Sequence, residues 1–267
     1  MKSLVQGDLI PAERHEYILN LIQQKKAVRV STLSGALGVS EITIRRDLER
    51  LEEQGVLERT HGGAILTQRM RQEPLYAQKE RLEIEAKRAI GQAAAQLVQP
   101  GETIFVNSGS TTRQIFSHLG YLPRLRVITS NAGAIAELDN HTESIELMVV
   151  GGTYRWQSNS LVGPIALSTI AQINASKTFL GVDGISIQHG LTTPIQDEAE
   201  VARAMIAQTH GAIIVVADHT KIGVVAEFVT CPLHRVEMIV TDARLDAEWR
   251  ETLNEQGIRV IVAKPMN

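Results

Sequence analysis

The stretch SEITIRRDLERLEEQGVLERTHGGAIL, residues 40–66, decides the fold of the first part of the chain. Its apolar residues Ile44, Leu48 and Leu51 are spaced four and three apart, which places them on one face of an α-helix. Ser40 comes directly before this pattern, where its hydroxyl can accept a hydrogen bond from the first helical turn. The stretch therefore predicts a helix that begins after Ser40 and packs its apolar face against other helices.

The flanking residues complete a small helical module. Gly55 follows the helix as a C-cap, and residues 56–66 alternate around His-Gly-Gly, which predicts a short β-hairpin. Upstream, residues 13–25 have one apolar helical face, and a second helix is expected to begin at Ser31 or Thr32. Two helices joined by a tight turn predict a helix-turn-helix, with the hairpin as its wing.

This module is predicted to bind DNA. The second helix of such a pair enters the major groove, with its first residues nearest the base edges. Arg45 and Arg46 diverge by about 100° around the helix, so one can face bases while the other reaches a phosphate. The alternative is a three-helix packing unit whose arginines are ordinary surface residues. The candidate DNA-binding residues are Ser40, Glu41, Thr43, Arg45 and Arg46 on the helix, and Arg59 and His61 on the wing.

The charge of the module limits how it can bind. Residues 1–66 hold nine Lys and Arg and nine Asp and Glu, so the module is formally neutral. Non-specific affinity for DNA comes almost entirely from positive charge, which argues against a protein that binds DNA without sequence preference. We therefore expect a homo-oligomer, a dimer or tetramer, whose two-fold symmetry matches palindromic half-sites in double-stranded operator DNA.

The composition sets outer limits on function. The 267 residues carry a net charge of −3, and Cys231 is the only cysteine, so no disulfide framework or cysteine cluster for zinc is expected. No apolar run is long enough to cross a bilayer, and the first residues lack the apolar core of a signal peptide. We expect a cytoplasmic protein that binds no metal, no cofactor and no membrane.

The second part of the chain alternates apolar strands with helical stretches. A helix over about 80–98 is followed by seven β-branched runs, which are typical of strands buried on both faces. This alternation predicts an α/β domain with a mainly parallel sheet. We expect a winged helix-turn-helix over 1–66, a polar linker over 67–80 and the α/β domain over 81–267. The predicted strands are TIFV, LRVIT, IELMVV, KTFLGVD, AIIVVAD, VEMIVTD and IRVIVA.

The first of these strands leads into FVNSGSTT, residues 105–112, and then into a predicted helix. Small hydroxyl residues and a glycine at a helix start can bind an anion, because backbone N–H groups and the helix dipole point at it. The stretch predicts an anion-binding loop formed by Asn107, Ser108, Gly109, Ser110, Thr111 and Thr112.

SEITIRRDLERLEEQGVLERTHGGA resembles the DNA-binding signature of the DeoR family of bacterial transcription regulators. The resemblance continues through FVNSGSTT, VITSN, VVGGTYR, FLGVDGIS, GLTT, DEAEVARAM and VVADHTKIG, and covers nearly the whole chain. It implies a C-terminal effector domain that resembles ribose-5-phosphate isomerase and senses a phosphorylated sugar or related metabolite. It also implies a transcriptional regulator, by family habit a repressor, with no catalytic residues.

The resemblance and the strand ends together give the candidate effector-binding residues. Asp183 and Lys221 are included because they match family positions that line the effector pocket, although Lys221 alone could be a surface lysine. Glu198 opens a helix, where its charge is favourable regardless of function. The family usually has an acidic residue where this chain has Asn107, and an amide can donate as well as accept. Beside the anion-binding loop, the candidates are Ser130, Asn131, Gly152, Asp183, Gly184, Glu198 and Lys221.

An enzyme is the alternative function. An aldose–ketose phosphate isomerase needs a general base and an electrophile, and Glu198 or Asp183 with Lys221 could supply them. A sensor for the same ligand would use the same residue types, so these residues do not separate the two functions. The resemblance to regulators favours the sensor.

Overall fold

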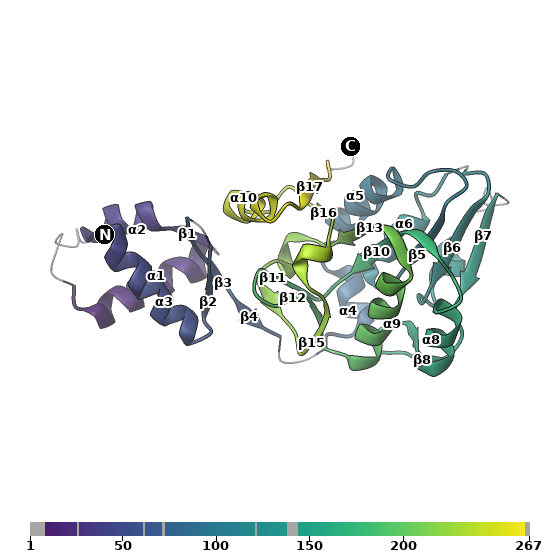
Figure 1. Ribbon diagram of the computed structural model, residues 1–267, viewed down its shortest axis with the longest axis horizontal. Helices are drawn as coiled ribbons and strands as arrows, with labels where there is room; N and C mark the ends of the chain where they lie inside the picture. Colours follow the sequence, from purple (N-terminus) through teal and green to yellow (C-terminus); the bar gives the residue numbers. More distant parts are fainter. Residues whose placement is uncertain are drawn as a thin grey trace. The chain divides into compact units, whose positions relative to one another are not determined.

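The structure is a computed structural model that describes residues 9–25, 27–60, 62–70, 73–120, 122–137 and 144–264. The backbone divides into two units, which we describe separately (Figure 1). The first unit comprises Met1–Arg69 with Asp246–Thr252, and the second comprises Met70–Leu245 with Leu253–Asn267.

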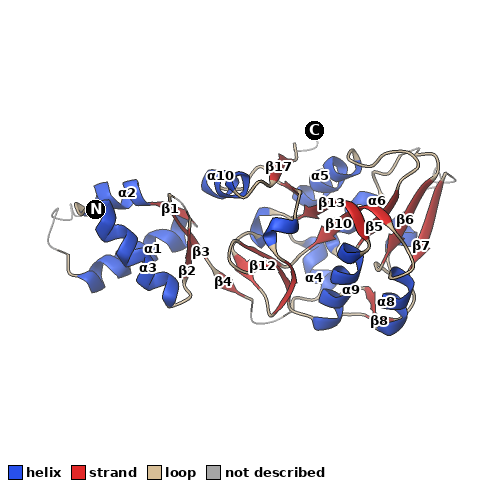
Figure 2. Ribbon diagram, viewed as in Figure 1, coloured by secondary structure: helices blue, strands red, loops and turns tan. Residues whose placement is uncertain are grey.

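The first unit is a winged helix-turn-helix. Its three strands form an antiparallel sheet in the order β1-β3-β2 (Figure 2), which confirms the predicted hairpin and adds β1 to it. The predicted N-cap at Ser31 or Thr32 is wrong, because β1 runs directly into α2 and leaves Arg29 as the N-cap. The elements are α1 (Pro11–Lys25), β1 (Ala27–Arg29), α2 (Val30–Leu37), α3 (Glu41–Glu53), β2 (Leu57–Arg59) and β3 (Gly63–Leu66), and β4 (Gln68–Arg69) follows.

Helix α3 is fixed by the residues that the sequence pattern singles out. The Ser40 hydroxyl accepts a hydrogen bond from the backbone N–H of Thr43 at 3.2 Å, which confirms the predicted N-cap. Gly55 adopts the left-handed conformation just beyond the helix end. Ile44 and Leu48 are fully buried with Ile18 of α1, so the apolar face of α3 packs as its spacing predicts.

A buried ion pair joins α3 to α1. The Asp47 carboxylate accepts hydrogen bonds from Arg14 Nε at 2.9 Å and Arg14 Nη2 at 3.3 Å, and it lies 3.0 Å from His15 Nε2. Asp47 is 2% exposed and Arg14 9% exposed. Neither charge can return to water unless α3 moves away from α1. The pair therefore holds α3 in place against α1.

The second unit is built on a seven-stranded sheet in the order β17-β16-β13-β10-β5-β6-β7. Each of its adjacent pairs is parallel, which confirms the predicted parallel α/β domain. All seven predicted runs form its strands. They are β5 (Thr103–Val106), β6 (Leu125–Thr129), β7 (Ile145–Val149), β10 (Ala175–Gly181), β13 (Thr209–Val216), β16 (Met238–Thr241) and β17 (Arg259–Val262).

Helices cover both faces of this sheet. Successive side chains along each strand point to opposite faces, and both faces carry apolar residues that the helices bury. Ile104 and Val106 of β5 pack with α5 and α6, whereas Phe105 packs on the other face with α8 and α9. The predicted helix over 80–98 is shorter than expected. The helices are α5 (Ile84–Ala95), α6 (Ser110–Phe116), α7 (Ala134–Glu137), α8 (Pro164–Ile170) and α9 (Gln196–Ala207), and α10 (Ala247–Glu255) is divided between the two units.

Several short elements were not predicted. Part of the predicted linker is helical, since α4 spans Tyr76–Arg81, and six residues are too few to give a periodic signal. The short strands lie in loops after the main strands. They are β8 (Thr153–Arg155), β9 (Ser160–Val162), β11 (Gly184–Ser186), β12 (Gly190–Thr193), β14 (Val224–Val225) and β15 (Phe228–Cys231), and short 3₁₀ turns span His219–Lys221 and Leu233–Arg235.

The order of the strands sets where a ligand can bind. From β5 the chain proceeds outward through β6 to β7, and then returns to place β10 on the other side of β5. Helices must diverge at such a reversal, so ligands in open parallel sheets bind beyond the carboxyl ends of the two strands that flank it. Here those ends are Asn107, after β5, and Gly181, the last residue of β10.

The Asp47 ion pair predicts a specific loss of stability. Replacing Asp47 by Ala leaves the Arg14 guanidinium buried without its partner, which costs about 3–5 kcal/mol. Hydrogen exchange over residues 41–53 should therefore accelerate strongly, while peptides from β5 and β6 exchange as before. The matched control is Glu53→Ala, an exposed carboxylate on the same helix. Equal exchange in the two variants would show that the pair does not hold α3.

Candidate functional site

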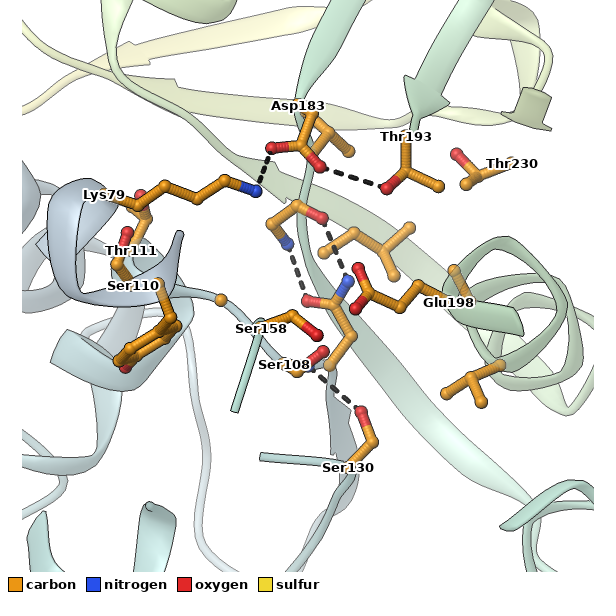
Figure 3. A pocket seen from close by; sticks show the side chains of 18 of the residues that line it. Lys79, Ser108, Ser110, Thr111, Ser130, Ser158, Asp183, Thr193, Glu198 and Thr230 are labelled. Carbon is orange, nitrogen blue, oxygen red and sulfur yellow. Dashed lines mark hydrogen bonds and ion pairs between the residues drawn. The ribbon is translucent and has the colours of Figure 1, made fainter. Parts of the chain in front are cut away.

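A pocket lies at the reversal of the strand order (Figure 3). Its walls come from the carboxyl ends of β5, β6 and β10, from the start of α9 and from α4. Nine of the predicted effector-binding residues line it, although they are spread over more than 110 positions of sequence. They are Asn107, Ser108, Gly109, Ser110, Thr111, Ser130, Asp183, Glu198 and Lys221.

The loop between β5 and α6 is held in one conformation by a glycine and by hydrogen bonds. Gly109 has φ 156° and ψ 154°, a conformation that is essentially restricted to glycine. The Thr112 hydroxyl donates to the carbonyls of Asn107 at 2.9 Å and Gly109 at 3.1 Å, and the Ser108 N–H donates to Ser130 Oγ at 3.0 Å. These bonds fix the loop so that Ser110 and Thr111 begin α6 at the pocket wall.

Asn107 holds the two central strands together. Its Nδ2 donates to the carbonyl of Gly181 at 2.9 Å, and its Oδ1 accepts from the N–H of Gly181 at 2.7 Å. The side chain thus pairs with the end of β10 as another strand would. A carboxylate could accept the second of these bonds but could not donate the first. The amide therefore satisfies both backbone groups of Gly181, which a carboxylate could not do.

Asp183 also lines the pocket, and each of its two oxygens has one partner. Its Oδ1 lies 2.6 Å from Lys79 Nζ, and its Oδ2 accepts from Thr193 Oγ1 at 3.0 Å. Lys79 comes from α4, so the cation arrives from a segment before the α/β domain's first strand. Figure 3 shows the Lys79 side chain extending from α4 to this carboxylate.

Glu198 forms a second acidic group in the pocket. Its Oε1 accepts from Ser160 Oγ at 3.0 Å and lies 3.5 Å from Arg155 Nη1. Burial raises the pKa of Glu198, and the nearby Asp183 charge acts in the same direction, while Ser158, Lys79 and Arg155 oppose both. The carboxyl therefore gains a proton more readily than an exposed one, and it can offer a hydroxyl group either an acceptor or a donor.

Four predicted effector-binding residues do not line the pocket in the described part of the chain. Asn131 is fully buried, accepts from the N–H of Gly133 and supports Gly109 from behind. At Gly152 an added Cβ would lie 2.3 Å from Val162 O. Thr112 and Gly184 likewise have packing roles, in the loop and beside β14. Direct contact with an effector stays a prediction for these four, as it does for the nine that line the pocket.

The pocket also contains residues that the sequence analysis missed. Thr192 and Thr193 lie in GLTT, a segment that the resemblance includes but that gave no candidate residue. Lys79 and Tyr76 lie in the polar stretch predicted to be linker, where nothing in the local sequence marks a binding residue. The other missed residues that line the pocket are Ser158, Val162, Leu180, Gly181, Val182, Val201, Ala202 and Thr230.

In the first unit, the predicted DNA-binding residues gather at the start of α3. Ser40, Glu41, Arg45 and Arg46 are exposed, and Thr43 is partly exposed beside its cap. Glu41 Oε2 lies 3.8 Å from Arg45 Nη2, a weak contact between exposed side chains. The polar start of the helix faces solvent while its apolar face is buried, as insertion into a groove requires.

The wing residues are placed less simply. The Arg59 guanidinium forms an ion pair with Glu52 of α3 at 2.9 Å, and its backbone N–H donates to the same carboxylate. Its predicted contact with the DNA backbone would require sharing this partner and stays a prediction. His61 lies outside the described residues.

The described residues include no helix that is long and apolar enough to span a membrane. Within the same ranges, no three His, Cys, Asp or Glu side chains come together as a metal site would require.

Family models match both units. Residues 14–70 match a DeoR-like helix-turn-helix domain, and residues 82–243 match the DeoR C-terminal sensor domain. The chain belongs to the DeoR family of transcriptional regulators. The two matches leave residues 71–81 between them, which is the segment that contains α4.

Relatives match over nearly their whole length. The chain is 34% identical to the transcriptional regulator GlpR of Haloferax volcanii, over 95% of this chain and 98% of the relative. It is 32% identical to the transcriptional repressor CsqR of Escherichia coli, over 93% of this chain and 94% of the relative. Ribose 5-phosphate isomerase A of Methanocaldococcus jannaschii is a structural neighbour with 16% identity and a TM-score of 0.36, over 51% of this chain and 53% of that chain.

These matches fix the general function. This DeoR-family chain is a DNA-binding transcriptional regulator with a C-terminal sensor domain, and such a domain implies a small-molecule effector. The relatives are named as regulators and not as enzymes, so the alternative of an isomerase is not supported.

The Asn107 pairing predicts the effect of restoring an acid. In Asn107→Asp the Gly181 carbonyl loses its donor and faces a carboxylate, which should lower the stability of the sensor domain by about 1–3 kcal/mol at neutral pH. The loss should shrink in acidic buffer, where a protonated carboxyl can donate again. Asn254→Asp, an exposed site on α10, is the matched control for thermal unfolding. An unchanged melting temperature in Asn107→Asp would show that the amide is dispensable.

Proposed function

We propose that this regulator is a repressor whose sensor domain binds a phosphorylated sugar, and that binding changes its affinity for operator DNA. One observation carries the proposal: a single pocket combines an anion-binding loop and two lysines with two carboxylates. A sugar phosphate has the matching pattern, with a dianion at one end and hydroxyl donors along the rest.

The anionic end of the effector fits the loop between β5 and α6. The first N–H groups of α6 lack partners within the helix, and the helix dipole favours negative charge there. Lys79 and Lys221 add positive charge within the same pocket. A phosphate placed against Ser108–Thr111 would therefore be held by both backbone N–H groups and cations.

The hydroxyl groups fit the opposite wall. Asp183 and Glu198 carry acceptor oxygens that line the pocket, and Thr193 adds a hydroxyl group. Buried polar groups of this kind discriminate strongly, because a ligand that lacks a matching hydroxyl leaves them without a partner. The arrangement supports a polyhydroxylated compound over a simple organic phosphate.

Repression is supported by the similarity of this chain to a protein that is named a repressor. A relative that matches nearly the whole chain is named a repressor. Operator binding by α3 would block transcription directly, and an effector would relieve it by favouring one of two arrangements of an oligomer. Its effect is limited to the difference between its affinities for those two arrangements.

The recognition surface can be tested by removing its arginines. Arg45→Ala and Arg46→Ala should each weaken operator binding by about 1–3 kcal/mol, which is roughly 5- to 150-fold. Fluorescence anisotropy on the DNA upstream of the protein's own gene would measure this. Arg50→Ala, on the exposed far end of α3, should change affinity by no more than about twofold. Wild-type affinity in both Arg45→Ala and Arg46→Ala would exclude α3 as the recognition helix.

The effector class can be tested by thermal shift. Ribose 5-phosphate, fructose 6-phosphate and their unphosphorylated sugars form a matched panel. A binding sugar phosphate should stabilise the sensor domain by about 2.7 kcal/mol at a concentration of 100 Kd, while its free sugar does not. The double variant Ser110→Ala, Thr111→Ala should lose most of this shift. The phosphate assignment is wrong if a free sugar raises the melting temperature as much as its phosphate does.

A further inference from the structure

We propose that Lys79 is an effector-binding residue that carries the signal out of the pocket, through the segment of residues 73–81 on which it lies. This proposal rests on the proposed function, because it assigns the regulation of the same site. Residue 73 comes three positions after Met70, where the match to the helix-turn-helix domain ends. The segment is therefore joined to the DNA-binding module by covalent connection.

The ion pair between Lys79 and Asp183 is the first observation. The two side chains are 15% and 12% exposed, and the 2.6 Å separation is that of a strong charge-assisted hydrogen bond. The pair is buried enough that solvent screens it little. Asp183 is thus held by α4 whenever the pocket contains no competitor.

An effector changes the partners of this pair. A hydroxyl group that donates to Asp183 competes with Lys79 for the carboxylate, while a phosphate against the loop offers Lys79 a dianion in the same pocket. Figure 3 shows the Lys79 amine directed at Asp183, in the pocket that Ser110 and Thr111 also line. Lys79 can therefore exchange one anionic partner for another, and the ion pair that joins α4 to Asp183 is then lost.

A second connection joins the same segment to the other acidic wall. Arg155 bridges Glu198 at 3.5 Å and Glu73 at 3.0 Å, and all three side chains are about 15% exposed. The second oxygen of Glu73, Oε1, is buried without a hydrogen-bond partner among the described residues. Arg155 is therefore the cation that pairs with Glu73. An effector that binds Glu198 competes with Arg155 for that carboxylate, and so affects the residue that pairs with Glu73.

A third connection comes from α6, the helix that follows the anion-binding loop. Arg113, on the first turns of α6, forms ion pairs with Glu80 of α4 and with Glu137, the latter at 2.8 Å from its Nε. The main chain is held as well, since the Tyr76 N–H donates to Gln157 O at 2.7 Å. Asp183 and Glu198 of the pocket, and Arg113 beside it, are thus each connected to residues 73–81 through charged pairs.

The segment ends at a fixed point. Lys87 of α5 is 2% exposed, and its Nζ donates to the carbonyls of Lys79 and, at 2.5 Å, Leu82. Both are carbonyls that the end of a short helix leaves without partners. This end of α4, including the carbonyl of Lys79, is therefore anchored to α5, so a new partner for the Lys79 amine acts on the residues that come before it in the segment.

The test compares Lys79→Met with Arg81→Met, which removes an exposed charge from the same helix. Operator affinity is measured without a probe and with saturating fructose 6-phosphate or ribose 5-phosphate. At saturation, a weaker affinity of a variant for the probe does not change the ratio of these two operator affinities. In the wild type and in Arg81→Met, the probe should change operator affinity by about tenfold or more. In Lys79→Met the change should fall to about twofold or less, with the ligand-free affinity close to that of the probe-saturated wild type.

The thermal shift that a probe causes in the wild type distinguishes failure of this proposal from failure of the proposed function. If the wild type responds to a probe and Lys79→Met at saturation shows the same ratio, this proposal is wrong and the proposed function stands. If no probe shifts the wild type, both are wrong. Lys79→Gln guards against a folding defect, because glutamine can still donate to Asp183 but carries no charge to a phosphate. Wild-type coupling in Lys79→Gln would also overturn the proposal.

Discussion

The sensor domain depends on a constraint of parallel sheets: the carboxyl ends of all strands meet at the same edge. The order of the strands reverses between β5 and β10, and Asn107 closes the gap there by pairing with both backbone groups of Gly181. This pairing positions the loop that begins at Ser108 on one side and Asp183 on the other. The loop of residues 107–112 and the carboxylates of Asp183 and Glu198 thus meet at one pocket.

The pocket is completed by a segment from outside the sheet. Lys79 forms an ion pair with Asp183, and Arg155 bridges Glu73 and Glu198. Arg113 of α6 pairs with Glu80 of α4 beside the pocket. In many ligand pockets the walls are rigid secondary structure, whereas here one wall is the connection between the two family domains. An effector that competes for these carboxylates acts directly on that connection, and no long path through the core is needed.

The sequence predicted the features that depend on local pattern. The seven strands, the Ser40 cap and the loop after β5 could all be found because apolar periodicity and turn chemistry are local. Asn107 could be recognised as unusual, but its partner Gly181 lies 74 residues away and is set only by the strand order. Lys79 could not be found, because a six-residue polar helix has no periodicity and its carboxylate partner is 104 residues distant.

The most direct test of this account is hydrogen exchange of the full chain with and without saturating fructose 6-phosphate or ribose 5-phosphate. The account predicts slower exchange in the loop of residues 107–112 and, at the same probe concentration, a changed exchange rate over residues 76–82. Protection of the loop with unaltered exchange over residues 76–82 would contradict it, because the effector would then bind without acting on the segment that leads to the DNA-binding module.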